Sequence, residues 1–502
     1  MKTRTPSHIK SAVVAILFFG GVIALRANTI TVTNTNDSGP GSLRQALIDA
    51  NDGDTIDFAV TGTIGLTSGE LLVDKSITIS GPGVGNLAVN GNAKSRVLHI
   101  APGTTATISD LSIMNGNASG NVLDGGGIYS DHAILTLNGC EISNNSAFRD
   151  GGGVYNGGRM PPGRAFGSAT LTLNNCVVSD NSTGNDGGGI CNDASFGGNA
   201  SLQISNSAVR GNSALYGAGM LNDARKKGIA MLHISDSTLS KNAAGYGGAI
   251  LSIGDNLKST PLTVSNCTIS GNSAQVWGGG IFNHGMLTIG NSTISGNHVD
   301  GGGGGGVYNE SSILSVRSTF SDNSASSGGG IYNTGGGFPP SALEISNTIL
   351  NAGASGENIY NGGTVTSDGY NLSSDDGGGY LTGPEDQINT DPMLGPLQEN
   401  GGPTFTHALL PDSPAIDAGD PSFSPPPLYD QRGPGFNRVV NSRIDIGSFE
   451  VQGLTPTPTP TPMATATPTP TFTPTATPTP TATPRVTPRP RPNPHPRPSP
   501  PR

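Results

Sequence analysis

Three aspartates stand at one recurring position of the sequence. Asp124, Asp150 and Asp186 each come directly before a cluster of three glycines. If equivalent positions stack on successive turns of the fold, their carboxylates lie about 5 Å apart. Charges of one sign at that distance either turn apart into water or share a cation such as calcium. We favour the first interpretation, because turn positions of a repeat accept whatever polar residue fits, and so we expect no metal or other cofactor.

The same three aspartates allow an enzymatic alternative. A glycoside hydrolase needs carboxyl groups that converge on the scissile bond, one of them with a raised pKa. A polysaccharide lyase needs carboxylates that hold calcium and a basic side chain that removes a proton. Asp124, Asp150 and Asp186 are the candidates for either role. We expect a protein without catalytic activity and keep the carbohydrate-active enzyme as the alternative.

Six basic residues fall in segments that interrupt the repeat. These insertions span residues 157–169, 223–230 and 254–261. Their basic residues are Arg159, Arg164, Arg225, Lys226, Lys227 and Lys258. Insertions on one face of a repeat fold are commonly where partners bind. One hypothesis is that this edge is a contact surface for an anionic glycan or an acidic surface protein, and the other, which we slightly favour, is a set of solvated loops whose length is tolerated.

The composition excludes two classes of protein. Of the 502 residues, 76 are Gly, and only 12% are charged, which argues against a helical bundle. The formal net charge is −10. Binding to nucleic acid needs clustered Lys and Arg to neutralise phosphates, so nucleic acid is not expected as a partner.

The repeat consists of two short patterns. A glycine cluster leads into an apolar pair and, in most units, an Asn, as in GGVYN at 152–156. Alternating apolar and polar residues then lead to an apolar-Ser-x-Asn step, as in LTLNNCVVSDN at 171–181 and LTIGNSTISGN at 287–297. Alternation with a period of two predicts strands, and Gly, Asn, Asp and Ser between them form turns. Each unit therefore predicts three short strands and three corners.

Units this short bury their apolar residues only by stacking on one another. Stacking lays Leu on Leu, Ile on Ile and Tyr on Tyr, and we expect these side chains to close a continuous interior. Strands of successive coils then pair in parallel. The sequence predicts an all-β protein, a right-handed parallel β-helix (a solenoid) over residues 61–382, with the hand taken from the usual crossover preference. Asn side chains at one corner are expected to form a structural ladder.

The two ends of the repeat region predict caps. Residues 42–51 form the one good amphipathic helix, with Leu43, Ala46, Leu47 and Ala50 on one face and Ser42 as its N-cap. We expect an N-terminal cap over residues 28–60. Residues 383–453 lose the repeat and are expected to be a C-terminal cap module, since an uncapped stack exposes strand edges.

The outer segments of the chain predict export. Residues 1–27 resemble a signal peptide, with Lys2 and Arg4 before an apolar run and Ala27 suited to cleavage. The chain is therefore expected to be secreted or displayed on the cell surface, with no membrane-spanning segment in the mature chain. Residues 454–502 alternate Thr and Pro and predict a disordered, extended stalk without a core.

The cysteines fall at positions of the repeat. Cys140, Cys176 and Cys267 share one position, where other units carry Ser, and Cys191 stands where several units carry Tyr. We interpret them as small buried residues. The alternative is a disulfide between Cys140 and Cys176, which adjacent coils bring close enough in principle.

Several segments resemble known families. SLRQALIDAN at 42–51 and SITISGPG at 76–83 resemble the start of bacterial exported right-handed parallel β-helix repeat proteins. GGAI at 247–250 and FSDN at 320–323 match the two short motifs of polymorphic outer membrane protein repeats. The stretch at 389–420, with DQRG at 430–433 and DIGSFE at 445–450, is similar to the choice-of-anchor Q domain. The resemblance implies the architecture of an exported β-helix protein, and together with the composition we expect a scaffold that serves in adhesion or in contact with the envelope or a polysaccharide.

Overall fold

The computed structural model describes residues 27–120, 122–159, 167–310, 312–336 and 340–453. The predicted signal peptide up to residue 26, the Thr/Pro segment 454–502 and the candidate Arg164 lie outside the described residues. Residues up to 453 belong to one compact unit, which is described below.

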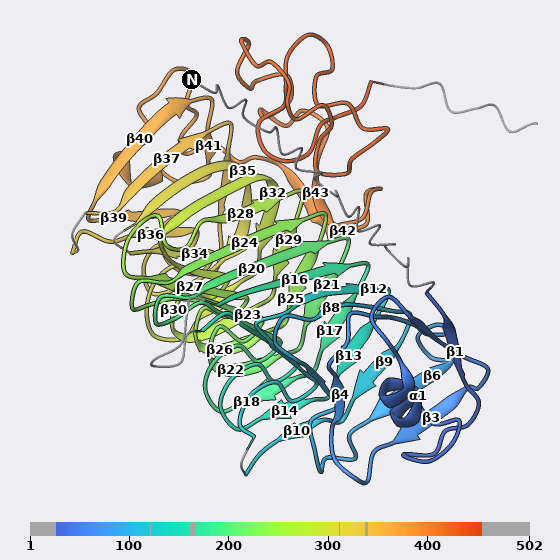
Figure 1. Cartoon of the computed structure of the whole chain (residues 1–502). Coiled ribbons are helices and arrows are strands. Elements are labelled where there is room, and N and C mark those ends of the chain that lie inside the picture. The colour runs from blue at the N-terminus through green and yellow to red at the C-terminus, as the bar shows by residue number, and fades with distance from the viewer. Residues whose placement is uncertain (1–26, 121, 160–166, 311, 337–339, 454–502) are drawn as a thin grey trace, which may run out of the picture. The chain divides into compact units, whose positions relative to one another are not determined.

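The unit is a stack of coils, each of which adds one strand to an 11-stranded parallel sheet. The strands pair in chain order, which confirms the predicted parallel β-solenoid (Figure 1). They are β4 (Leu71–Val73), β7 (Leu98–Ile100), β11 (Ile128–Asp131), β15 (Val154–Gly157), β19 (Ile190–Asp193), β23 (Met220–Ala224), β27 (Ile250–Gly254), β31 (Ile281–His284), β34 (Val307–Asn309), β36 (Ile331–Asn333) and β39 (Ile359–Asn361).

Two further sheets complete the coils. A 23-stranded sheet takes up to two strands from each coil, and a seven-stranded sheet forms a short third side. The first contains β1 (Thr29–Val32), β2 (Thr55–Phe58), β3 (Gly62–Gly65), β5 (Thr78–Ser80), β6 (Leu87–Asn90), β8 (Thr105–Ser109), β9 (Ser112–Met114), β12 (Ile134–Asn138), β13 (Glu141–Ser143), β16 (Ser168–Asn174), β17 (Val177–Ser179), β20 (Asn199–Ser205), β21 (Ala208–Arg210), β24 (Ile229–Ser235), β25 (Thr238–Ser240), β28 (Leu262–Ser265), β29 (Thr268–Ser270), β32 (Met286–Ser295), β35 (Ile313–Asn323), β37 (Ala342–Ser346), β38 (Ile349–Ala352), β40 (Thr364–Gly369) and β41 (Leu372–Ser373). The second contains β10 (Asn117–Ala118), β14 (Ser146–Ala147), β18 (Ser182–Thr183), β22 (Ser213–Tyr216), β26 (Ala243–Tyr246), β30 (Ser273–Trp277) and β33 (His298–Val299).

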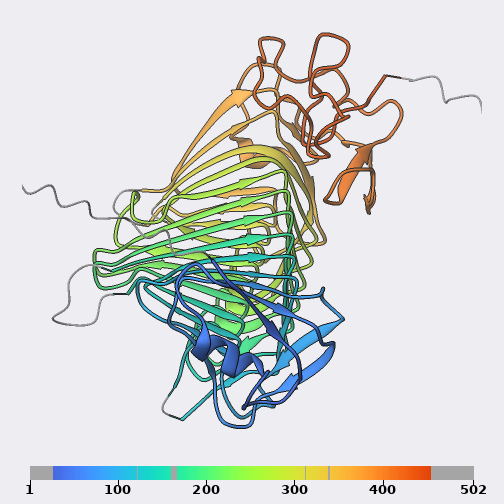
Figure 2. The same ribbon diagram turned by 45° about the vertical axis from the view of Figure 1, so that its right-hand side comes forward.

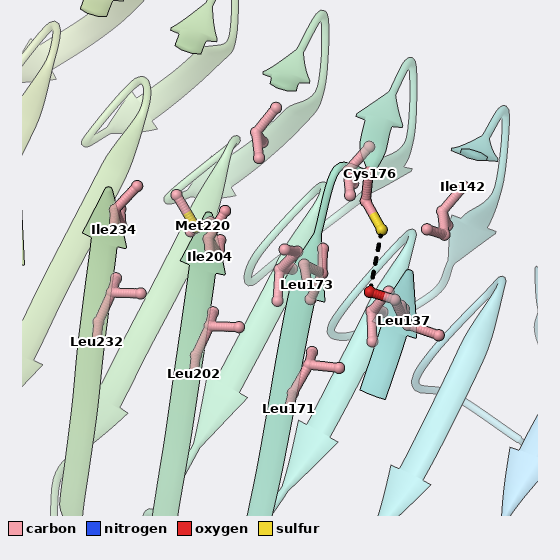
Figure 3. Close-up of a cluster of buried hydrophobic side chains, with 14 of the residues drawn as sticks. Leu137, Ile142, Leu171, Leu173, Cys176, Leu202, Ile204, Met220, Leu232 and Ile234 are labelled. Carbon is pink, nitrogen blue, oxygen red and sulfur yellow. Dashed lines mark hydrogen bonds between the residues drawn. The ribbon is translucent and has the colours of Figure 1, made fainter. Parts of the chain in front are cut away.

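The interior consists of aliphatic side chains stacked in register. Leu171, Leu202 and Leu232 are direct partners on β16, β20 and β24, and all three are buried (Figure 3). Cys176 lies in the same core and donates its thiol hydrogen to the Leu137 carbonyl at 3.4 Å (Figure 3). All four cysteines are buried free thiols. Cys140, Cys176 and Cys267 occupy the core, whereas Cys191 lies in the outer cluster with Tyr155, and all four are small buried side chains, as the first interpretation proposed.

The tyrosines of the repeat do not close this interior. Val154 belongs to the aliphatic core, whereas its neighbour Tyr155 belongs to a separate cluster. Side chains alternate between the two faces of a strand, so the second apolar residue of each pair faces outward. The prediction of an interior Tyr stack was therefore wrong, and the Tyr ladder lies on the outer face of the 11-stranded sheet.

The Asn ladder at the corner after β13 and its equivalents is confirmed. The Asn145 side-chain amide donates to Asn181 at 3.0 Å, and Asn181 donates to Asn212 at 3.1 Å. The same side chains also accept backbone N–H groups of the preceding coil, as Asn181 does from Asn145 at 2.9 Å. Every coil corner in this row is thereby tied to the next.

Both ends of the aliphatic core are covered. The helix α1 (Leu43–Asp49) begins after Ser42, whose hydroxyl accepts the Gln45 backbone N–H. It packs Leu43 and Leu47 against the first coils, at the blue end in Figure 1. At the other end, Leu381 and Tyr380, next to the short 3-10 turn η1 (Gly377–Gly379), pack against the last coil.

The module that follows covers a flank of the stack. It contains the antiparallel pair β42 (Leu394–Gln398) and β43 (Thr406–Leu409). Its Gln431 amide donates to the backbone carbonyl of Cys267 at 3.1 Å, and its Ser448 N–H donates to the Thr319 hydroxyl of β35 at 3.0 Å. Thr268 of β29 and Thr293 of β32 offer further hydroxyl groups to Gln431. The module, coloured orange to red in Figure 2, therefore lies beside the coils, and the end of the core is closed by Leu381.

Among the described residues, no helix has the length and apolar content needed to cross a membrane.

Candidate functional site

One ladder of side chains runs along the edge of the 11-stranded sheet, with aspartates on the first coils and aromatic residues on the later ones. Asp150 pairs in parallel with Asp186, and Asp186 pairs with Tyr216. Tyr216 pairs with Tyr246, and Tyr246 with Trp277. Each of these residues precedes a glycine with positive φ, such as Gly187 at +66°. That turn leads the chain into the sheet, so every coil presents its ladder residue at the same edge.

The carboxylates of the ladder do not turn apart into water. Asp124, one coil before Asp150, accepts a bidentate pair of hydrogen bonds from Arg149, one of them from Nε at 2.8 Å. Arg149 also lies 3.4 Å from Asp150, and Arg225 lies 3.5 Å from Asp186. All three aspartates are buried. The preferred interpretation was wrong, because these guanidinium groups supply the positive charge that lets the carboxylates stay out of water.

The pKa values of two of the aspartates, Asp150 and Asp186, are strongly raised. Burial, with the nearby Asp186 charge, raises the pKa of Asp150 from 3.8 to about 7. Burial also raises the pKa of Asp186 to about 6, although Arg225 opposes this shift. Buried acids whose pKa values approach neutrality are candidates for proton transfer. The pair therefore has acid–base capacity in the neutral range.

The residues at this corner do not fit calcium. Both carboxylate oxygens of Asp124 are occupied by the Arg149 guanidinium. Within the described ranges, no three His, Cys, Asp or Glu side chains converge as metal ligands would. Calcium needs six or more oxygen ligands, which the described residues at this corner do not offer.

The outer face of the sheet is hollowed next to this ladder. Tyr155 stacks on Tyr129 at 5.2 Å, and Tyr308 stacks on Tyr332 at 5.1 Å between ring centroids. Three successive coils after Tyr155 carry shorter residues at the same position, namely Cys191, Leu221 and Leu251, and Phe282 then precedes Tyr308. Because these side chains do not fill the space of a Tyr ring, a depression remains in the ladder.

Two adjoining cavities occupy the depression. The carboxylate cavity, about 340 Å³, is lined by Arg149, Asp150, Arg159, Asn185, Asp186, Cys191, Asp193, Ser195, Phe196, Leu221, Asp223, Arg225 and Lys226. The aromatic cavity, about 380 Å³, is lined by Asp186, Tyr216, Leu221, Arg225, Tyr246, Leu251, Ile253, Trp277, Phe282, Tyr308 and Glu310. They share Asp186, Leu221 and Arg225, so they form one groove, which runs from β15 to β34 along the stack.

Of the basic candidates from the insertions, some line this groove and others lie on the surface outside it. Arg159, Arg225 and Lys226 line the carboxylate cavity. Lys227 and Lys258 are exposed and line neither cavity of the groove. Part of the basic set thus meets the acidic corner at one site, which spacing along the chain does not reveal.

Sequence reasoning missed the aromatic half of the groove. Tyr216, Tyr246 and Trp277 stand directly before Gly clusters, as Asp150 and Asp186 do. Alignment of that repeat position would have found them. Phe196 lies in an insertion outside the repeat, where no periodic signal identifies it.

Comparison with known proteins supports the repeat assignment. The model for the Chlamydia polymorphic membrane protein repeat matches residues 266–284 and 317–334. The second match contains the FSDN motif at 320–323, whereas GGAI at 247–250 lies outside both. Among solved structures, the chain is similar to the pectate lyase Pel9A with 13% identity and a TM-score of 0.44, over 85% of this chain and 96% of that chain. A likeness of this degree does not identify an activity. The curated proteins contain no significant match.

Proposed function

We propose that this protein binds a polysaccharide chain in the groove, as an exported or surface-displayed β-helix scaffold. The observation that carries the proposal is the ladder that changes from Asp150 and Asp186 to Tyr216, Tyr246 and Trp277 beside a hollow face. Aromatic rings offer flat apolar surfaces on which sugar rings pack. Carboxylate and guanidinium groups bind sugar hydroxyls.

The shape of the groove suits a polymer. Residues from successive coils line the two cavities, so the groove extends along the direction in which the coils stack. Parallel strands lie about 4.8 Å apart, a distance comparable with the length of one sugar unit in an extended chain. Each coil therefore contributes one ladder side chain for about one sugar unit.

The setting of this binding is proposed to be the cell surface. The matches to a polymorphic membrane protein repeat support a protein of the surface or outer membrane type. The predicted signal peptide and the choice-of-anchor Q resemblance add export and attachment through the C-terminal module. A scaffold that binds a glycan at the cell surface would serve in adhesion or in contact with the envelope. An acidic surface protein is the other partner proposed, for the exposed loops.

Trp277 makes the proposal testable because it is the only tryptophan of the chain. We would titrate the secreted full chain with a panel of polysaccharides and follow its emission. Binding in the groove should shift the emission to shorter wavelength. By calorimetry, Trp277→Ala should weaken binding at least tenfold, whereas Tyr360→Ala, on the same outer face beyond the cavities, should leave it within twofold. Binding without an emission change would place the ligand elsewhere and reject the groove.

A second candidate is cleavage of the bound chain, favoured by the adjacency and raised pKa of Asp150 and Asp186. Carboxyl groups about 5 Å apart suit retaining hydrolysis. Protonated Asp150 would give its proton to the glycosidic oxygen while the Asp186 carboxylate bonds to the anomeric carbon. Water would then replace Asp186 and return a proton to Asp150. New reducing ends that disappear in Asp150→Asn would establish a hydrolase, unsaturated products would indicate a lyase, and neither product would leave binding alone.

A further inference from the structure

Phe196 lies against two cations from two different insertions. The Arg159 guanidinium carbon is 4.6 Å from the centre of its ring, and the Lys226 ammonium nitrogen is 3.7 Å from it. Both distances are those of cation–π contacts. One aromatic ring therefore gathers two positive charges at the rim of the carboxylate cavity.

The loop that carries Phe196 is fixed by hydrogen bonds. The Ser195 N–H donates to the Asp193 carboxylate at 2.8 Å, and the Phe196 N–H donates to the Arg225 carbonyl at 3.0 Å. Phe196 has a φ of +63°, a backbone conformation that residues other than Gly rarely adopt. The backbone that carries the ring is thus tied to neighbouring coils on both sides of Phe196.

Charge pairing separates the four basic side chains of the cavity into two kinds. Arg149 pairs with Asp124, and Arg225 pairs with Asp223 at 2.7 Å. Arg159 and Lys226 form no ion pair with any described residue, and each places its charged group over the Phe196 ring. Two positive charges that face the groove therefore lack an anionic partner within the part of the chain that the structure describes.

We propose that Arg159, Lys226 and Phe196 form a subsite for an anionic sugar unit, one that carries a carboxylate. The inference rests on the proposed polysaccharide binding. It adds that the sugar unit bound at the Phe196 end of the groove is acidic. A guanidinium fork and an ammonium group bind a carboxylate with charge-assisted hydrogen bonds. The aromatic cavity, with Glu310 as its one additional acid beside Asp186, takes the neutral sugar faces.

The experiment compares chemically matched polymers. Polygalacturonate, alginate and hyaluronate are each titrated against the full chain beside their carboxyl-reduced forms, with Trp277 emission and calorimetry as readouts. At least one acidic polymer should bind about tenfold more tightly than its reduced form. Equal affinity for both forms of every bound polymer would overturn the subsite and leave the proposed function standing. No response to any polymer would reject the proposed function itself.

Two double variants test which basic residues produce the preference for the acidic polymer. Arg159→Gln with Lys226→Gln should remove the preference for the acidic form, with unchanged affinity for the reduced form. Lys227→Gln with Lys258→Gln removes the same charge from exposed insertion residues and is the matched control, for which we expect a change below twofold. An equal loss in both double variants would show that only the overall charge matters and would overturn the subsite.

Discussion

Asp186 and Tyr216 are direct register partners on adjacent coils. They mark the point at which one ladder passes from buried carboxylates to aromatic rings, and Asp186 lines both cavities of the groove. Because the coils share one backbone path, this change needs no new loop or domain. The change at this repeat position gives the groove two chemically distinct halves, while loops add Arg159, Phe196 and Lys226 to the carboxylate half.

Binding of an acidic chain should weaken as the pH rises through 6 to 7. The carboxylate cavity is lined by four acidic and four basic side chains. When Asp150 and Asp186 are protonated the lining carries a net charge of about +2, and when both ionise it is about zero. We expect the affinity for an acidic polymer to fall about three- to tenfold from pH 5 to pH 8.

Titration calorimetry of the chain with Asp150→Asn and Asp186→Asn supplies the control. This double variant keeps the positive lining at both pH values, so its affinity should stay nearly constant. A carboxyl-reduced polymer should show no pH dependence with either protein. A rise of affinity with pH would contradict the assignment of these two groups.

Asp150→Asn should stabilise the protein above pH 7. The pKa of Asp150 is about 7 in the folded chain and near 3.8 when unfolded, so the folded state holds the proton more tightly. Stability is therefore lost as the pH rises from about 4 to 7, and the penalty is full above 7. The amide keeps the acceptor oxygen for Asn185 and removes the penalty, at most about 4 kcal/mol at pH 8.

Thermal unfolding at pH 4 and pH 8 measures this effect. At pH 4 the variant and the parent should melt together, because the carboxyl is protonated in the folded parent. Asp180→Asn, which changes an exposed aspartate, should shift neither curve. A lower melting temperature for Asp150→Asn at pH 8 would show that its carboxylate is stabilising.

The groove owes its depth to short residues, and Leu221→Tyr should fill it. Leu221 lines both cavities and stands in the ladder that carries Tyr155 and Tyr308 elsewhere. A Tyr ring fits the stacking of that ladder and occupies the depression. We expect polysaccharide affinity to fall at least tenfold, with a melting temperature within a few degrees of the parent. Unchanged affinity would mean that the ligand does not enter the depression.

The repeat made most of the fold predictable, and its limits explain what was missed. Period-two alternation and turn residues placed the coils, the Asn ladder from Asn145 onward and the N-cap at Ser42, because each depends on local sequence. The orientation of Tyr155 depends on which face of a strand meets the interior, and two apolar neighbours such as Val154 and Tyr155 leave that choice open. Arg149 and Phe196 act through contacts between coils, which spacing alone does not reveal.

The flank position of the C-terminal module should depend on Gln431. Its buried side-chain amide donates to the Cys267 carbonyl and the Thr268 hydroxyl, both at 3.1 Å, and its oxygen accepts the Thr293 hydroxyl at 2.6 Å. Gln431→Ala leaves these groups without partners in a buried interface, at a cost of about 2–3 kcal/mol. Local opening should then become easier for residues 391–453 while the coils stay closed.

Hydrogen exchange followed by mass spectrometry distinguishes local from global loosening. In Gln431→Ala, peptides of the module should exchange about 10- to 100-fold faster, whereas peptides from β16 to β24 should keep the parent rate. Gln398→Ala, which changes an exposed Gln of the same module, should alter neither. Faster exchange in the coils as well would show that the module stabilises the whole stack, because its loss would then lower the free energy of unfolding of every coil.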